Sequence, residues 1–296
     1  MRPSRHDLNL ILVSAIWGGN YSASKLAVAH TPPLVFSALR FLISTTLLWL
    51  IVLATERSPP LSRRTFWILI GWGFVGYGLN QVALLYGLRY SSPTNAALIF
   101  SNLPVVVALL GIWLGAERPS ARVWTGIALG TIGVAVVVAA KGTRFESTTR
   151  LGDVLNVLAL LFWALFTVGI RGAAQGLSAL KVSAVAHLGA TPGLAIAAIP
   201  VLVKAPGPSL HPSVWPTVAY AALLASVLAS ILWTQSLKAV GGSRTALFNC
   251  VTPIFAALSA WMVFGERPVP VQALGAALVF VGVVISGKKA EVASRE

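Results

Sequence analysis

Four side chains in the first apolar segment of the chain recur at a helical spacing. Trp17, Asn20, Tyr21 and Ser24 stand at i, i+3, i+4 and i+7, which places them on one face of an α-helix. Aromatic rings contact the apolar body of a small molecule, and neutral amides and hydroxyls bind its polar groups. The row therefore predicts a wall that recognises an uncharged or zwitterionic solute.

A related row lies later in the chain, where Trp163, Phe166, Thr167 and Ile170 take the same spacing. Polar and aromatic residues of other segments are expected to meet these two rows around a cavity. Tryptophans near segment ends, such as Trp67, are expected to anchor in the membrane interface instead. The expected substrate contacts are Trp17, Asn20, Tyr21, Tyr77, Gln81, Phe100, Asn102, Trp163, Thr167, His187, Ser230, Trp233 and Asn249.

Pro104 and Pro253 each fall near the middle of an apolar segment. Because proline lacks an N–H, the carbonyls of Phe100 and Asn249, four residues earlier, are expected to lose their helical donors. A freed carbonyl beside a cavity can accept from the ammonium group of a substrate. Both prolines are therefore expected to act as kinks and hinges. A kink whose carbonyl is satisfied by water or a nearby hydroxyl remains open as an alternative.

Carboxylates are absent from the interior of every apolar segment. A charge within lipid costs about 2.5–3.5 kcal/mol on insertion scales, so a buried acid normally marks a function. Their absence disfavours the exchange of cationic drugs against protons through a buried carboxylate. The acids fall in loops, tails or segment ends, at Asp7, Glu56, Glu117, Glu146, Asp153, Glu266, Glu291 and Glu296.

Two other titratable side chains fall inside apolar segments. His187 is expected to be neutral and hydrogen-bonded, with substrate contact or proton transfer as alternatives. Arg40 is expected to reach the interface or a backbone carbonyl. Hydrolysis or group transfer needs a nucleophile with a base, or a metal cluster. Because the histidines are scattered and Cys250 is the only cysteine, we expect no enzyme activity, metal site or cofactor.

The composition indicates that membrane helices hold these residues. The chain of 296 residues is 56% hydrophobic and only 10% charged, which leaves too few charges to cover soluble domains. A crossing needs about 20 mostly apolar residues, and the chain offers about ten such stretches. They are expected at 7–29, 34–54, 66–88, 93–115, 121–140, 151–173, 179–203, 214–237, 243–265 and 269–287.

Basic residues give a net charge of +14, but they lie singly or in pairs between apolar stretches. A nucleic acid needs basic side chains gathered on one solvated face, so we expect no nucleic-acid partner. With the N-terminus inside, the cytoplasmic loops collect about twice as many Lys and Arg residues as the opposite side. Both chain ends are therefore expected in the cytoplasm, and the expected partners are the lipid bilayer and a small solute.

The second half of the chain repeats features of the first. Residues 88–146 align without a gap with residues 237–295, and the tripeptide Glu-Arg-Pro occurs at corresponding places in both. We expect two five-helix repeats, at 1–149 and 150–296. An odd number of helices inserts the two copies in opposite orientations. Inverted repeats around a central cavity are typical of alternating-access carriers.

Several of these motifs resemble a known family. The run Trp17-Gly18-Gly19-Asn20-Tyr21, the tripeptide Leu39-Arg40-Phe41 and the two proline-centred helices ending in Glu-Arg-Pro resemble the EamA-type branch of the drug/metabolite transporter superfamily. The resemblance covers nearly the whole chain. It implies ten helices, inverted five-helix repeats, export or exchange of small metabolites across a bacterial inner membrane, and a gating role for Arg40. Within the family, the chain looks most similar to the YddG-type exporters of aromatic and other neutral amino acids.

Together these features predict an all-α membrane protein with ten transmembrane helices around a central cavity. We expect a monomeric inner-membrane carrier that exports neutral amino acids, aromatic ones included, by alternating access and facilitated diffusion. An EamA-type exporter of other small metabolites or lipophilic drugs, with or without proton coupling, is the alternative. An intramembrane enzyme is less favoured because His187 has no acidic partner in any apolar segment. A passive receptor or assembly subunit would leave the inverted repeat unexplained.

Overall fold

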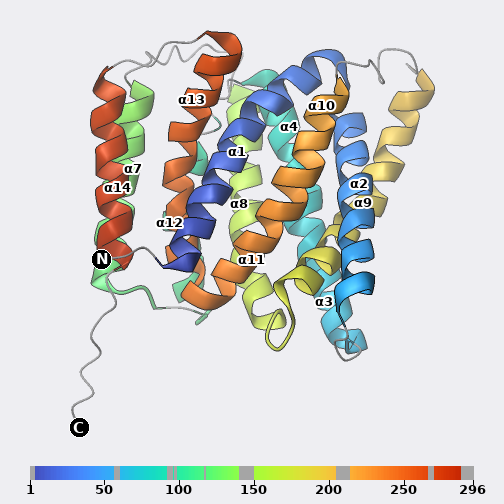
Figure 1. Ribbon diagram of the computed structural model, residues 1–296, viewed down its shortest axis with the longest axis horizontal. Coiled ribbons are helices and arrows are strands. Elements are labelled where there is room, and N and C mark those ends of the chain that lie inside the picture. Colours follow the sequence, from blue (N-terminus) through green and yellow to red (C-terminus); the bar gives the residue numbers. More distant parts are fainter. Residues whose placement is uncertain are drawn as a thin grey trace.

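The computed structural model describes residues 4–56, 61–91, 96, 99–116, 118–139, 150–204, 214–265 and 270–287. Regular structure within these ranges is helical, with no strand, which confirms the all-α prediction. The helices stand alongside one another in a bundle, and α1 (Arg5–His30) begins at the same end at which α14 (Pro270–Gly287) stops (Figure 1). This end is the lower one in Figure 1.

Three of the helical rods change their hydrogen-bonding pattern along their length. One rod passes from α3 through the π-helical η1 into α4, another from α10 through the π-helical η5 into α11, and a third from α12 through the 3₁₀ segment η6 into α13. Such irregular stretches are sites where backbone geometry departs from the α-helical ladder. The remaining bounds are α2 (Pro33–Thr55), α3 (Arg63–Gly73), η1 (Phe74–Leu79), α4 (Asn80–Tyr90), α6 (Leu103–Trp113), α7 (Ala121–Ala139), α8 (Arg150–Ala173), α9 (Ala179–Lys204), α10 (Trp215–Ala219), η5 (Tyr220–Leu228), α11 (Ala229–Val240), α12 (Gly242–Leu247), η6 (Phe248–Val251) and α13 (Thr252–Phe264).

Six of the described helical stretches have the length and composition of membrane spans. Most of their ends lie within a few residues of the expected segments, because the apolar stretches themselves end there. Shorter apolar helices occur at Leu103–Trp113 and Leu274–Ser286. The total of ten crossings stays a prediction. Within the described residues, six stretches are long and apolar enough to cross: Pro33–Thr55, Arg63–Tyr90, Arg150–Ala173, Ala179–Lys204, Trp215–Val240 and Gly242–Val263.

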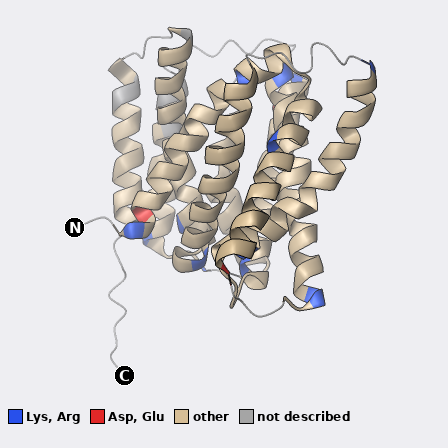
Figure 2. Cartoon of the chain, turned by 45° about the vertical axis from the view of Figure 1, so that its right-hand side comes forward, with Lys and Arg blue, Asp and Glu red and all other residues tan. Residues whose placement is uncertain are grey.

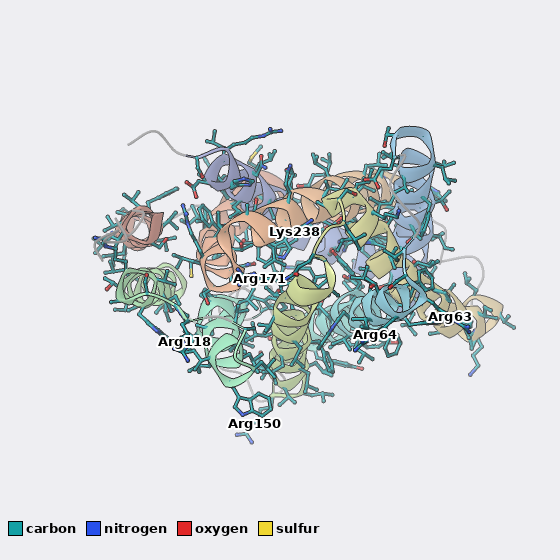
Figure 3. All side chains as sticks on the ribbon, turned by 90° about the horizontal axis from the view of Figure 1, so that it is seen from below. Arg63, Arg64, Arg118, Arg150, Arg171 and Lys238 are labelled. Carbon is teal, nitrogen blue, oxygen red and sulfur yellow. The ribbon has the colours of Figure 1, made fainter. Side chains whose placement is uncertain are left out.

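The charged residues of the described chain lie mainly toward the two ends of the bundle (Figure 2). Trp67, Trp113 and Met262 expose 60%, 78% and 83% of their surfaces on the outside. Seen from below, Arg63 and Arg64 lie at one edge of the bundle, while Arg171 and Lys238 lie nearer its middle (Figure 3). Exposed apolar side chains between charged ends are what a lipid environment favours.

Three pairs of residues at equivalent positions of the two expected repeats, 146 or 149 residues apart, lie in contact inside the bundle. A hydrogen bond joins two such threonine hydroxyls, two such tryptophan rings touch edge to face, and a cysteine thiol approaches the carbonyl at the equivalent position. The pairs are Thr45 with Thr191 (2.7 Å, 146 residues apart), Trp17 with Trp163 (5.5 Å between ring centroids), and Cys250 Sγ with Ser101 O (3.6 Å, 149 residues apart).

Helices α7 and α14 pack side by side at one edge of the bundle (Figure 1). A Cβ atom added to Gly126 would lie 2.7 Å from the Gly282 carbonyl oxygen, and one added to Gly133 would lie 2.5 Å from that of Gly275. The backbones approach this closely because glycine has no side chain. Residue numbers rise along one helix as they fall along the other, so the two helices are antiparallel.

Parts of the expected repeat fall outside the described residues. These parts are Glu117 of the first Glu-Arg-Pro motif, the whole second motif at 266–268, and the junction at 149. The division into 1–149 and 150–296 therefore stays a prediction.

Candidate functional site

Helix α1 presents its row of Trp17, Asn20, Tyr21 and Ser24 to a cavity inside the bundle. The cavity holds about 680 Å³ of space, including the part open to solvent. The described lining consists of Trp17, Asn20, Tyr21, Ser24, Arg40, Tyr77, Asn80, Gln81, Leu84, Leu88, Phe100, Trp163, Ala225, Asn249 and Thr252.

The two π-helical stretches border this cavity. Tyr77 of η1 and Ala225 of η5 belong to its lining. Neighbouring helices hold η5 by side-chain hydrogen bonds, from Trp17 Nε1 to the Ala225 carbonyl at 3.1 Å and from Arg40 Nε to Ser226 Oγ at 2.6 Å. The wider turn of a π-helix frees backbone groups from the regular ladder and is frequent at functional sites.

Three tryptophans form a cluster at the lower side of the cavity. The ring centroids of Trp17 and Trp163 are 5.5 Å apart, those of Trp17 and Trp233 are 5.0 Å apart, and those of Trp163 and Trp233 are 5.9 Å apart. Tilted and edge-to-face ring contacts of this kind are favourable. The lining continues from this cluster toward Ser24 and Leu88, near the upper ends of α1 and α4 (Figure 1).

Polar contacts join the helices at the lower end of the bundle. Asp7 at the start of α1 forms an ion pair of 2.7 Å with Arg244 of α12. Asn9 Nδ2 donates to Gln235 Oε1 of α11 at 3.3 Å. These contacts tie α1 to the second half of the chain below the tryptophan cluster.

Several lining side chains carry a buried polar atom that lacks a partner among the described residues. The atoms are Asn20 Oδ1, Gln81 Nε2, Asn249 Nδ2 and Thr252 Oγ1. Buried polar groups are almost always hydrogen-bonded in native proteins, by protein, water or ligand. The cavity therefore offers amide and hydroxyl groups that a polar solute or water can satisfy.

Two expected contacts are packed behind the cavity wall. Thr167 is fully buried, and its hydroxyl donates to the Trp163 carbonyl at 2.8 Å. His187 is also fully buried, with Nδ1 2.9 Å from the Ser183 carbonyl oxygen and its ring 4.1 Å from that of Tyr77. Tyr77 contacts the His187 ring and lines the cavity, whereas neither Thr167 nor His187 is part of the described lining.

Three other expected contacts also lie outside the described lining. Trp233 belongs to the tryptophan cluster, and it touches the ring of Trp17 rather than the cavity. The Ser230 hydroxyl donates to the Val227 carbonyl at 3.1 Å within its own helix. Asn102 lies in a turn directly before α6. The role of all thirteen candidates in substrate binding stays a prediction.

Ser24, the last member of the row that predicts a cavity wall, belongs to the described lining. Other lining residues were not among the thirteen candidates. Asn80 has a clear sequence signal, because it stands beside Tyr77 and Gln81 on the same helical face. Leu84, Leu88 and Ala225 carry none, since apolar residues in apolar helices do not reveal what they face. Arg40 had been expected to reach the interface or a carbonyl, whereas it lines the cavity and bonds Ser226. The remaining unexpected lining residue is Thr252.

Each proline stands close to the start of a regular α-helix, and Pro253 lies inside the rod that runs from α12 through η6 into α13. Pro104 stands in the first turn of α6 and Pro253 in the first turn of α13, where the missing N–H has no helical partner to lose. The Asn249 carbonyl accepts from the Thr252 N–H in the 3₁₀ segment. The expectation that Pro253 frees this oxygen is therefore wrong, because a shorter helical turn supplies another donor.

Comparison with known proteins shows similarity to membrane transporters. The sequence pattern of the EamA-like transporter family matches residues 5–139 and residues 150–287. The chain is 27% identical over 285 residues to the uncharacterized transporter YetK of Bacillus subtilis, which covers 94% of this chain and 86% of that protein. It is 27% identical to an uncharacterized transporter of Archaeoglobus fulgidus, over 97% of this chain and 98% of that one.

Two further similarities concern a shorter match and a solved structure. A probable amino-acid metabolite efflux pump of Salmonella typhimurium is 28% identical over 156 residues, which cover 52% of this chain and 49% of that protein. A solved crystal structure superposes with a TM-score of 0.76 at 22% identity, over 96% of this chain and 97% of that one. The superposition shows that this chain shares a known fold.

Proposed function

Because this chain belongs to the EamA-like transporter family, we propose that it exports neutral amino acids, aromatic ones among them, by alternating access. The proposed location is the inner membrane of a bacterium, with both termini in the cytoplasm and the protein acting as a monomer. The observation that carries the proposal is the cavity, which combines aromatic walls with unpartnered amides and hydroxyls.

The lining suits a molecule with an aromatic or apolar side chain and a polar head. Trp17, Trp163 and Tyr77 provide ring surfaces for the side chain. Asn20 and Gln81 provide amides for the head group. Among the described lining residues there is no carboxylate that could hold a proton or attract an organic cation. This supports downhill facilitated transport of neutral solutes.

Contacts between equivalent residues support two inverted repeats. When two copies of a unit are related by a twofold axis, a residue can touch its own equivalent only close to that axis. Thr45 with Thr191 and Trp17 with Trp163 are contacts of this kind, as is that of Cys250 with the Ser101 carbonyl.

The antiparallel crossing of α7 and α14 gives independent support. At the offset of 149, Gly126 corresponds to Gly275 and Gly133 to Gly282. The contact between Gly126 and Gly282 thus has its counterpart in the contact between Gly133 and Gly275. Reciprocal contacts are the mark of a twofold interface. The family pattern also matches the chain once on each side of residue 149.

The arrangement of the cavity supports a state open on the side away from the termini. The tryptophan cluster lies below the lining that extends toward Ser24 and Leu88, and the contact of Asp7 with Arg244 lies below the cluster, at the lower end of the bundle. In an inverted repeat, the opposite state arises when the halves exchange their conformations. The carrier then releases on the cytoplasmic side a solute that it bound on the opposite side. The same cycle run in reverse exports the solute.

Counterflow in proteoliposomes tests the proposal. The purified full-length protein should exchange radiolabelled phenylalanine, methionine or threonine across the membrane without a pH gradient. Lysine and glutamate should not compete. Transport of a quaternary ammonium compound in preference to phenylalanine would contradict the proposal.

The upper wall of the cavity favours a second candidate, an exporter of lipophilic drugs or other metabolites. Leu84, Leu88 and Phe100 make this part of the lining apolar. The same counterflow assay separates the candidates. Competition by uncharged lipophilic compounds, without competition by amino acids, would select the second one.

A further inference from the structure

Arg40 is the one charged side chain in the described lining of the cavity. It lies in α2 and exposes only 7% of its surface. A cation held at this depth is costly in a bilayer, so such residues are normally paired or functional. The question is therefore what neutralises the guanidinium.

The described residues do not supply an opposite charge. Arg40 Nε donates to Ser226 Oγ at 2.6 Å, and the guanidinium carbon lies 5.7 Å from the centre of the Phe41 ring. No described carboxylate forms an ion pair with it. Asp7 is engaged by Arg244 at the lower end of the bundle, and Asp153 accepts from the Ser91 hydroxyl.

The hydrogen bond to Ser226 orients the guanidinium. With Nε held, the two terminal nitrogens have no hydrogen-bond partner among the described residues, and together they form a planar pair of donors. Such a pair matches the two oxygens of a carboxylate. Ser226 belongs to the π-helical η5, whose neighbouring residue Ala225 lines the cavity. The donor is thereby fixed at the cavity wall.

We propose that Arg40 binds the carboxylate of the transported solute, so that a carboxylate is required for recognition and an ammonium group is not. The proposal rests on the proposed function and deepens it by naming the group that selects the substrate. The remaining lining agrees with this division. The amides of Asn20, Gln81 and Asn249 serve the other polar groups, and no described lining residue carries a negative charge to attract an amine.

Three compounds with the same ring test which group is recognised. They are phenylalanine, phenylalaninamide, which lacks the carboxylate, and 3-phenylpropionate, which lacks the ammonium group. Binding to the purified full-length protein is measured by quenching of tryptophan fluorescence, because Trp17 and Trp163 line the cavity. Phenylalanine and 3-phenylpropionate should bind, and phenylalaninamide should bind at least about tenfold more weakly.

Substitutions at the site show whether Arg40 causes this selection. Arg40→Gln should weaken both carboxylates about 10- to 100-fold and leave phenylalaninamide unchanged. Arg40→Lys keeps the charge without the planar fork, and Ser226→Ala removes only the orienting hydrogen bond, so both should give smaller losses in the same direction. Arg89→Gln changes an exposed arginine outside the lining and should have no effect. If Arg40→Gln does not fold, the losses of affinity in Arg40→Lys and Ser226→Ala show whether Arg40 selects for the carboxylate.

The outcomes separate this inference from the proposed function. Equal transport of phenylalanine by the wild type, Arg40→Lys and Ser226→Ala would overturn the role of Arg40 and leave amino-acid export standing. Binding of 3-phenylpropionate that depends on Arg40, without any transport of amino acids, would support the role of Arg40 and overturn amino-acid export. Tighter binding of phenylalaninamide than of phenylalanine would overturn both.

Discussion

Helices α1 and α8 carry matching rows of side chains at an offset of 146 residues, but their neighbours cover them differently. In α1 all four members of the row, from Trp17 to Ser24, line the cavity. In α8 only Trp163 does so. Phe166 and Thr167 are buried, Phe166 with its ring 5.0 Å from that of Tyr77. One row is open to a solute and the other is sealed by protein.

The same contrast holds for the next pair of helices. Arg40 of α2 lines the cavity, whereas the residue 146 positions later in α9 is the fully buried Ala186. Phe41 corresponds to His187, and the two rings lie 5.3 Å apart. The difference teaches that equivalent positions in two related halves can have different roles, one at a cavity wall and the other in the packed interior. In these two pairs of helices, the first half supplies polar side chains to the cavity wall, whereas the second half supplies mainly buried packing.

Phe166→Ala should have the largest effect on stability, because it empties a fully buried position in the sealed row. A loss of about 3–5 kcal/mol is expected for such a cavity. Thermal unfolding in detergent measures it. Tyr21→Ala is the matched change in the open row, and it should cost clearly less. Equal losses at the two positions would remove the distinction between the rows.

Trp17→Ala and Trp163→Ala should reduce transport strongly, because these rings lie at the cavity wall. A fall in flux of roughly 30-fold at low substrate corresponds to about 2 kcal/mol of lost binding, as for a central contact residue. Trp67→Ala, which changes a tryptophan that is 60% exposed, is the control and should stay within about twofold. Equal flux in all three variants would contradict the site.

Asn20→Ala should reduce binding of phenylalanine about tenfold while leaving the unfolding temperature nearly unchanged. The reason is that Asn20 Oδ1 has no hydrogen-bond partner among the described residues, so the loss of this oxygen breaks no hydrogen bond within them. Binding is followed by tryptophan fluorescence. Thr167→Val should show the reverse, with little change in binding. An unchanged affinity in Asn20→Ala would remove the amide from the site.

The threonine pair between the halves should give the smallest effect. Thr191 donates to the His187 carbonyl and so keeps a partner without Thr45. Thr45 has only Thr191 among the described residues. Thr191→Val should therefore cost about 1–2 kcal/mol of unfolding free energy, and Thr45→Val less than about 1 kcal/mol. Thermal unfolding of both variants tests the order, and the opposite order would contradict the assigned directions of donation.

The positions of the helices could be predicted from the sequence because bilayer thickness sets the length of an apolar segment. The face of α1 could be predicted as well, since its spacing gathers Trp17, Asn20 and Tyr21 on one side. For α8 the same spacing predicts which residues share a face, but it does not predict which other residues cover that face. What covers Thr167 depends on its distant partners, and no periodicity in the sequence reveals them.

Two further features depended on backbone geometry. The position of Arg40 at the cavity wall depends on a hydrogen bond to Ser226, 186 residues away, in a π-helical stretch. The occupied Asn249 carbonyl depends on a 3₁₀ turn before Pro253. Departures from the α-helical hydrogen-bonding pattern have weak sequence signals, so neither the position of Arg40 nor the donor to the Asn249 carbonyl could be predicted.

Cysteine accessibility tests most directly whether one row is open and the other sealed. The only native cysteine, Cys250, is fully buried and can be replaced by serine to give a background without thiols. On this background, Asn20→Cys should react with a membrane-impermeant thiol reagent, and phenylalanine should protect it, while Thr167→Cys should not react. If Thr167→Cys reacted and phenylalanine protected it, while Asn20→Cys did not react, the assignment of an open row in α1 and a sealed row in α8 would be contradicted.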